Sequence, residues 1–451
     1  MSIKRIIFIG NCHKTNFWSA IAKQLTFNGY EVDWILVNRS QVHDIQANFA
    51  ESKILYLPLS LKASGSFGDM KLNDLVYRDR RLRFIRKDGL RYLRNIQAPI
   101  TDFLMNGHEA LVVGELTYGY EMVTHRIVNS LPGFYWCSPF LTRRPQGKFS
   151  FFYDEHFSRE IDIAYSKVKA IIVDQPMAMD YVAMNKNHVR DMSSGGYILR
   201  KIKTFLLNTG YDENDPTWFS NSRSDKLKKN ITWLWNRISY QFVQRLFVSE
   251  LDLSKRYIIF PLHLEPELNI DTCGRYWEDQ METILKIWRQ LLPNDVLLIK
   301  EHPVAIGNRG FTWFKKLKGY PNIKFIHESQ DVGELLTLVE YVFTISGTMG
   351  LEAAHKGMKV LCLGSTVYDR LKNVTRVSIN DFSESKNIDD LYCNYGFDTL
   401  ELDFEDFSTL IEERSFYGDP EGDVVSNPDV YSEVNIALVA GAFDSVCREL
   451  N

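Results

Sequence analysis

Short apolar runs alternate with segments of helical periodicity in the first part of the chain. The runs 5–9 and 31–37 predict buried strands, and the amphipathic segment 16–28 between them predicts a helix that ends at a glycine. A further apolar run, 110–113, predicts another strand. This order predicts a Rossmann-like domain, although the turn after the first strand lacks the GxGxxG spacing of a dinucleotide site. We interpret His13 in that turn equally as a ligand contact or an ordinary turn residue.

The same alternation returns near residue 255. Apolar runs predict strands, amphipathic segments predict the helices between them, and strands separated by helices pair in parallel. The chain is therefore predicted to be α/β, with two Rossmann-like domains facing a cleft. The predicted strands of the second domain are 257–262, 295–300, 322–326, 341–345 and 358–363, and its helices are 276–291, 311–317, 331–339 and 348–356.

Looser patterning between these regions predicts the domain boundaries. We assign 1–175 to the N-terminal domain, 176–254 to a helical linker region and 255–400 to the C-terminal domain. The tail 401–451 ends in a predicted amphipathic helix, 431–450, that packs back across the domain junction. The linker helix 231–246 carries several aromatic residues, which favour packing on a domain over resting at a membrane interface.

Polar residues follow three strands of the second domain at the point where each strand ends. Ser346, Gly347 and Thr348 lie where a strand becomes a helix, so backbone N–H groups and the helix dipole suit a phosphate there. Glu352 follows one turn later, within reach of a ribose. The other two strand ends carry His263, Glu265 and Glu267, and Lys300, Glu301 and His302. In a parallel sheet all three sets meet at the carboxyl edge, where such sheets bind ligands.

The first domain offers fewer candidates. Glu115 ends a strand and suits acid–base work, whereas Glu121, inside the following helix, is predicted to be a surface residue. Arg143 and Arg144 form a basic loop that suits an anionic substrate or is simply exposed. The arginine-rich stretch 77–94 is predicted to be a solvated helical face interrupted near its glycine. The alternative is an anionic partner, either a phospholipid surface or the diphosphate of a lipid-linked acceptor.

Composition narrows the class of protein. The 451 residues are 45% hydrophobic and 24% charged with a net charge of −4, which gives no global attraction to nucleic acid. We find no run of 18 uncharged apolar residues and expect no export signal. The six cysteines have no metal-ligand spacing, which fits a reducing cytoplasm and predicts no structural metal. A cytoplasmic protein is expected, with a peripheral position on the inner membrane left open.

The strand-end segments carry a family resemblance. Segments 261–267, 300–303, 346–353 and 357–361 resemble the signature set of bacterial capsule and lipopolysaccharide polysaccharide-biosynthesis proteins. These are similar to the retaining β-Kdo transferases of GT-B fold, which use CMP-activated ulosonic acids. The resemblance covers about 256–371 and is weaker before that, where only 114–115 and 143–144 can be placed. The chain departs from the family pattern at Glu265.

The resemblance implies a retaining, metal-independent glycosyltransferase. Its donor would be a CMP-sugar carrying Kdo or a related nonulosonic acid. Its acceptor would be a growing, lipid-linked surface saccharide, with the N-terminal domain as the acceptor domain. No cofactor is implied beyond the donor substrate. No DxD motif lies in a suitable loop, which disfavours a metal-dependent transferase.

Catalytic roles follow from that chemistry. Departing CMP would be stabilised by His302 and Lys300, with Arg143 and Arg144 as candidate partners of the donor or acceptor. Retention of the anomeric configuration needs either a carboxylate nucleophile or a front-face mechanism. Glu267 is the preferred candidate for the nucleophile, and Glu265 is the second. The alternative for both carboxylates is helix capping. Two other functions fit the same architecture, a sugar-nucleotide epimerase and a non-catalytic glycan-binding subunit.

Overall fold

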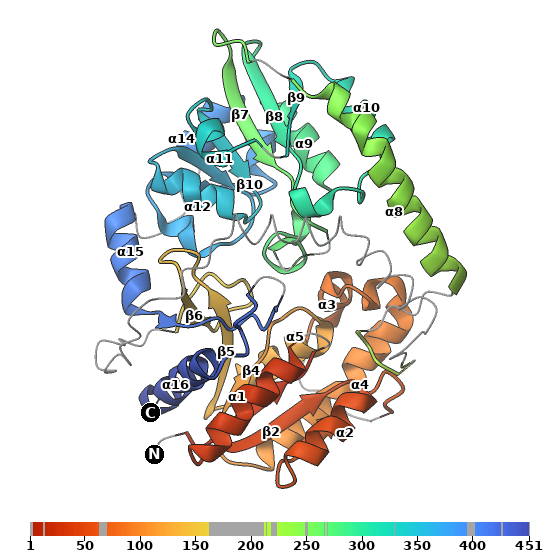
Figure 1. Cartoon of the computed structure of the whole chain (residues 1–451), viewed down its shortest axis with the longest axis vertical. Coiled ribbons are helices and arrows are strands. Elements are labelled where there is room, and N and C mark those ends of the chain that lie inside the picture. The colour runs from red at the N-terminus through yellow and green to blue at the C-terminus, as the bar shows by residue number, and fades with distance from the viewer. Residues whose placement is uncertain are drawn as a thin grey trace. The chain divides into compact units, whose positions relative to one another are not determined.

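The computed structural model of the chain divides into two compact units (Figure 1). Unit 1 comprises Met1–Ser220 and Ser408–Asn451, and unit 2 comprises Asn221–Phe407. The cleft expected between the two units stays a prediction. The structure describes residues 3–11, 14–62, 70–161, 212, 214–217, 223–248, 251–265, 267, 269–328, 330–394, 402–424 and 427–450. His13 lies outside these residues.

The sheet of unit 1 has the strand order β13-β6-β5-β4-β1-β2-β3. Neighbouring strands among β5, β4, β1, β2 and β3 pair in parallel. Strands β6 and β13 extend the sheet at one edge with antiparallel pairing. The strands are β1 (Arg5–Ile9), β2 (Glu31–Leu36), β3 (Ile54–Tyr56), β4 (Ala110–Val113), β5 (Phe134–Leu141), β6 (Lys148–Phe152) and β13 (Phe416–Tyr417). The main helices are α1 (Thr15–Phe27), α2 (Arg39–Asn48), α3 (Leu72–Arg78), α4 (Arg86–Met105), α5 (Gly119–Val128) and α16 (Glu433–Glu449).

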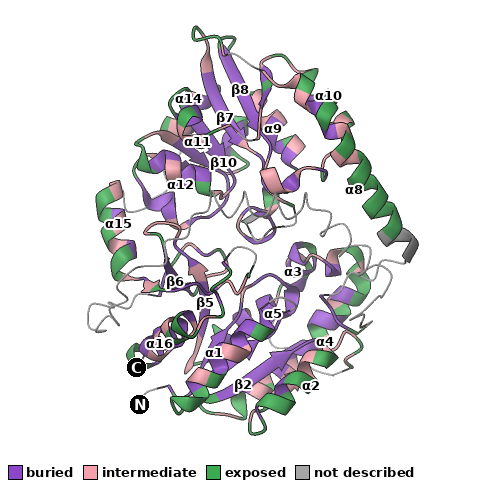
Figure 2. Ribbon diagram, in the orientation of Figure 1, coloured by how far each residue is buried: buried purple, intermediate pink, exposed green. Residues whose placement is uncertain are grey.

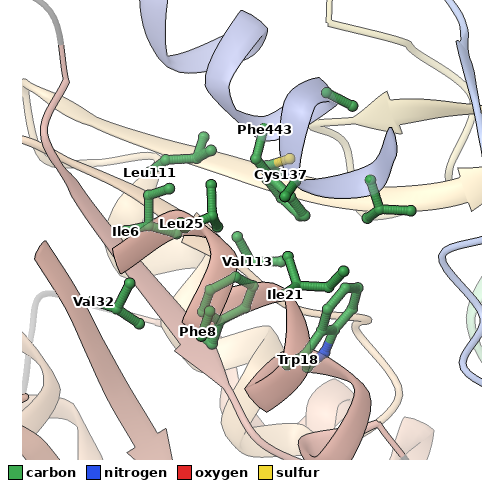
Figure 3. Close-up of a cluster of buried hydrophobic side chains, with 14 of the residues drawn as sticks. Ile6, Phe8, Trp18, Ile21, Leu25, Val32, Leu111, Val113, Cys137 and Phe443 are labelled. Atoms are coloured by element: carbon green, nitrogen blue, oxygen red, sulfur yellow. The ribbon is translucent and has the colours of Figure 1, made fainter. Parts of the chain in front are cut away.

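Two helices from opposite ends of the chain close the core of unit 1. The apolar positions of α1 recur at helical spacing, so Trp18, Ile21 and Leu25 face β1 (Figure 3). Helix α16 adds Phe443, whose ring lies 5.7 Å from that of Phe8. Burying one such side chain contributes about 1.5–3 kcal/mol. The C-terminal segment is therefore a structural part of unit 1.

Unit 2 contains a six-stranded sheet of order β12-β11-β10-β7-β8-β9. All its neighbouring strands are parallel, as predicted. The strands are β7 (Arg256–Pro261), β8 (Asp295–Lys300), β9 (Ile323–Ile326), β10 (Tyr341–Thr344), β11 (Lys359–Cys362) and β12 (Val374–Arg376). The helices are α8 (Arg223–Val243), α9 (Gln280–Trp288), α10 (Phe311–Lys318), α11 (Val332–Leu336), α12 (Thr348–His355), α13 (Asp381–Glu384), α14 (Ile388–Asn394) and α15 (Phe404–Glu413), the last continuing into unit 1.

The α/β class with two Rossmann-like units is thus confirmed. Of the segment predicted as a linker, 176–254, helix α8 belongs to unit 2, and 176–211 lies outside the described residues. The predicted helix 276–291 is shorter, since Asp279 caps α9 by accepting the Glu282 N–H.

The arginine-rich stretch 77–94 differs from its prediction in two ways. The helical interruptions lie at 79–81, after α3, and at Ile85, between a 3₁₀ turn and α4, whereas Gly89 is inside α4 and packs against Leu82. Arg78 is 4% exposed and pairs with Glu155 at 2.7 Å. A fully solvated face is therefore the wrong interpretation, because part of this basic stretch is tied into unit 1.

Candidate active site

The candidate site lies at the carboxyl edge of the central strands of unit 2. Strand β7 comes first in the chain and lies at the centre, β8 and β9 follow on one side, and β10 to β12 lie on the other. The strand order therefore reverses between β7 and β10. Open α/β sheets bind ligands at such a reversal.

The turn from β10 into α12 is shaped by two glycines. Gly347 is the N-cap of α12, and its N–H donates to Thr344 Oγ1 at 2.9 Å. A Cβ at Gly347 would lie 2.7 Å from His263 Cε1, and one at Gly350 would lie 2.7 Å from the Tyr368 hydroxyl. That hydroxyl donates to the Gly347 carbonyl at 2.7 Å. Close packing thus holds the start of α12 at the edge of the sheet, where its dipole favours an anion.

His263 joins β7 to this turn. The Ile345 N–H donates to His263 Nε2 at 3.1 Å, so the neutral ring carries its proton on Nδ1. Burial, helped by the nearby His302 and Arg309, lowers the pKa of His263 to about 3. The ring is therefore neutral at pH 7, with Nδ1 turned toward Gly347, 3.4 Å from where a Cβ would stand.

His302 has the opposite tautomer. It caps the 3₁₀ turn Pro303–Ala305, where the Val304 N–H donates to His302 Nδ1 at 3.2 Å. Burial and the charges of Arg309 and Lys300 lower the pKa of His302 to about 4. At neutral pH it offers an Nε2–H donor that carries no charge.

Arg309 connects the two histidine loops, and sequence reasoning missed it. Its Nη1 donates to Glu301 Oε1 at 2.7 Å, and its Nη2 donates to the His263 carbonyl at 2.8 Å and to Glu265 Oε1 at 3.2 Å. Burial raises the pKa of Glu301, and the Arg309 charge opposes this shift. Glu301 could have indicated this residue, because a carboxylate at a buried strand end needs a cation nearby. Arg309 is the next arginine along the chain.

Gln280 was also missed. Its side-chain carbonyl accepts the His263 N–H at 2.7 Å, and its amide nitrogen donates to the His263 carbonyl at 3.1 Å and to Glu265. A helix residue seventeen positions away thereby fixes the loop after β7. Nothing in the local sequence pattern indicates this pairing.

The remaining predicted residues of unit 2 have different surroundings. Lys300 is 6% exposed and donates to the Glu328 carbonyl, so it ties β8 to the loop after β9. Burial lowers its pKa. Glu267 is partly buried, and its carbonyl accepts the Asp271 N–H at 2.9 Å. Ser346 precedes the N-cap of α12, Thr348 is its exposed first residue, and the partly buried Glu352 lies one turn into the helix.

Glu115 lies at the corresponding strand reversal of unit 1, between β1 and β4. It pairs with the buried Lys14 and accepts from Asn11 Nδ2. Lys14 also lies 3.2 Å from Glu421, which comes from the C-terminal segment. Glu115 is therefore part of an ion-pair network that joins the turns after β1 and β4 to the C-terminal segment.

The surface position predicted for Glu121 is wrong. Glu121 is 0% exposed, and its Oε2 accepts the N–H groups of Thr117 and Tyr118 at 2.8 and 2.9 Å. Burial, with a further contribution from the charge of Glu115, raises the pKa of Glu121 to about 7. The helix start needs these caps, and the periodicity of the sequence does not distinguish a folded-back carboxylate from an exposed one.

Arg143 and Arg144 lie in the turn between β5 and β6, both partly buried. Together with Glu115 they belong to unit 1, whereas the candidates at the carboxyl edge of β7, β8 and β10 belong to unit 2. Across the described ranges, no group of three or more His, Cys, Asp or Glu residues is arranged to hold a metal ion. None of the helices described is long and apolar enough to cross a membrane.

Residues 209–382 match the family model "Capsule polysaccharide biosynthesis protein". This segment contains all the site residues of unit 2, and it confirms the family resemblance seen over 256–371. No curated protein matches the chain.

Solved structures with a similar fold include both transferases and epimerases. The β-Kdo 2,7 transferase of Thermosulfurimonas dismutans KpsC is 12% identical, with a TM-score of 0.36 over 90% of this chain and 99% of that one. The β-Kdo 2,4 transferase of the same KpsC is 12% identical, with a TM-score of 0.34 over 90% and 97%. The UDP-GlcNAc 2-epimerase of Methanocaldococcus jannaschii is 14% identical, with a TM-score of 0.26 over 90% and 98%. Likenesses at this level do not separate the two activities.

Proposed function

We propose that this protein is a retaining, metal-independent glycosyltransferase that transfers a ulosonic acid from a CMP-sugar to a bacterial surface polysaccharide. The supporting observation is the start of α12 at the strand reversal, beside two neutral histidines, inside the segment that matches capsule biosynthesis proteins. Kdo or a related nonulosonic acid is the proposed sugar, and a lipid-linked saccharide is the proposed acceptor.

The donor phosphate would bind at the first turn of α12. There the N–H groups of Thr348 and Met349 at the helix start and the Ser346 and Thr348 hydroxyls would supply donors without a metal. Glu352 would bind the ribose one turn later. The phosphate oxygen leaves the anomeric carbon with the electrons of the broken C–O bond, and His302 Nε2–H would donate to the charge that develops.

The carboxylate of the sugar calls for a cation nearby. Arg309 is 9% exposed at its side chain and is held between Glu301 and the more exposed Glu265. Its position between the two histidine loops makes it the proposed source of positive potential in the site. Lys300 is a second positive charge near the site, since its charge contributes to the lowered pKa of His302.

Retention would follow from two inversions. A carboxylate oxygen, proposed for Glu267 with Glu265 second, attacks the anomeric carbon as CMP leaves. The acceptor hydroxyl then displaces this carboxylate, and Glu115 is the proposed acceptor of the hydroxyl proton. Intact-protein mass spectrometry after incubation with donor alone should show a sugar adduct that Glu267→Gln abolishes. An adduct that persists in this variant and maps to Glu265 would reassign the nucleophile, and no adduct in either protein would favour a front-face mechanism.

A nucleotide panel tests the donor class. CMP should raise the melting temperature more than UDP or GDP, because a ligand that binds only the native state stabilises it. A stronger effect of UDP would reject the CMP-sugar proposal. An epimerised nucleotide sugar from donor alone would instead identify an epimerase, and oligosaccharide binding without CMP release would identify a non-catalytic subunit.

A further inference from the structure

Helix α8 carries a continuous row of exposed apolar side chains. Its members recur at helical spacing within about 100° of the helix circumference and extend over about 22 Å. We call them the α8 apolar face: Leu227, Ile231, Leu234, Trp235, Ile238 and Phe242, which are between 48% and 70% exposed. Figure 2 shows α8 mostly in the colour of exposed residues.

The opposite side of α8 is firmly packed on unit 2. Tyr240 and Val243 are 4% and 0% exposed in the core of that unit. Asn236 Nδ2 donates to the Gly307 carbonyl at 3.2 Å, and the Tyr240 hydroxyl donates to Glu328 at 2.9 Å. These contacts hold the helix in one orientation on unit 2. The α8 apolar face therefore points away from the core of that unit.

The charge of this helix is unlike that of the chain. Segment 223–246 holds six basic residues and one acidic residue, Asp225, a net charge of +5 in a chain whose net charge is −4. Lys228 is exposed beside the apolar face, and the Arg245 guanidinium lies over the Phe242 ring at 5.1 Å. An apolar stripe with Trp and Phe, flanked by basic side chains, is the composition of helices that lie in the plane of a membrane interface.

We propose that the α8 apolar face binds the surface of an anionic bilayer, with the helix lying parallel to it. The apolar side chains would enter the boundary between headgroups and acyl chains, while the basic residues contact lipid phosphates. A second copy of the chain is a poor occupant, because a symmetric contact would bring together two helical segments that each carry a net charge of +5. The inference goes beyond the proposed function, since it assigns a surface and uses no residue of the candidate active site.

Vesicle flotation of the full chain tests the proposal. The protein should float with phosphatidylcholine vesicles that contain phosphatidylglycerol, and less with phosphatidylcholine alone or at high salt. The variant Ile231→Ser/Trp235→Ser/Ile238→Ser should bind at least roughly 30-fold more weakly, because it removes three membrane-entering side chains. The matched control Phe27→Ser/Leu253→Ser removes side chains that are 88% and 84% exposed elsewhere and should bind like the wild type.

A charge variant keeps the test independent of the apolar substitutions. Lys228→Glu/Arg245→Glu changes two exposed side chains next to the apolar face and should weaken binding to anionic vesicles roughly tenfold or more. The proposal is overturned if the wild type does not float with anionic vesicles, or if the triple serine variant floats equally well. Self-association of the wild type that the triple variant loses, without vesicle binding, would overturn it in favour of a protein–protein interface.

Discussion

Two histidines at the same sheet edge, the buried His263 and the partly buried His302, are fixed in opposite tautomers by single backbone hydrogen bonds. Ile345 N–H donates to Nε2 of His263, and Val304 N–H donates to Nδ1 of His302. Their pKa values of about 3 and about 4 keep both rings neutral at pH 7. A neutral donor avoids the cost of burying a second cation beside Arg309.

His302→Ala should lower kcat roughly a hundredfold or more, since it removes a preorganised donor to the leaving phosphate. Steady-state kinetics with CMP-sugar and acceptor measures this. His327→Ala is the control, because it removes a half-exposed histidine that follows β9. Turnover close to the wild type in His302→Ala would leave His302 only its structural role as a cap.

Glu121 predicts a specific pH dependence of stability. The pKa of Glu121 in the folded protein, about 7, lies above the ordinary value of 4.5. Its contribution to the free energy of unfolding is therefore fully present below about pH 4.5 and is lost as the pH rises through 7. Between about pH 5 and pH 8 the wild type should lose about 2 kcal/mol of unfolding free energy relative to Glu121→Gln, which does not titrate. Urea denaturation of both proteins across this range measures the difference. Parallel pH profiles would contradict the prediction.

At the scale of elements, the β10–α12 unit depends on close approach between a turn and a neighbouring strand. Gly347 leaves room for the His263 ring, and Gly350 leaves room for Tyr368. Protein interiors tolerate little added volume, so the position of the helix start is linked to the position of the β7 loop. The proposed phosphate site is therefore a property of three packed elements, β7, β10 and α12.

Gly347→Ala should weaken CMP binding by roughly tenfold or more, because the new Cβ would lie 2.7 Å from His263 and must displace it. Calorimetric titration with CMP measures the affinity. Gly441→Ala in α16 is the control, since a Cβ there meets nothing within 4 Å. Unchanged CMP affinity in Gly347→Ala would place the nucleotide elsewhere.

At the scale of the whole molecule, the two ends of the chain build one unit while the middle builds the other. Phe443 of α16 packs its ring 5.0 Å from Phe151 and 5.7 Å from Phe8, and Glu421 reaches Lys14. The C-terminal segment thus stabilises unit 1, whereas the proposed nucleotide site lies in unit 2.

Phe443→Ala should destabilise unit 1 by about 3–5 kcal/mol, because it leaves a cavity among buried aromatic rings. Scanning calorimetry should show an earlier unfolding transition, and CMP affinity at a temperature below it should be unchanged. Val434→Ala, on an exposed position of the same helix, should alter neither. A parallel fall in CMP affinity with Phe443→Ala would show that the two units are energetically coupled.

Local pattern alone predicted five of the six strands of unit 2, the helices between them and the carboxyl edge that carries the candidates. Apolar runs predict β1, β4 and β8 to the residue, because the interior of each strand is apolar and polar residues stand only at the ends of β1 and β8. Only the tertiary structure decided which polar groups meet there: Arg309 and Gln280 hold the histidine loops, Lys300 is bound to a backbone carbonyl, and Glu121 is buried. Pairings between charges and backbone groups depend on distances in the folded chain, and sequence spacing carries no record of them.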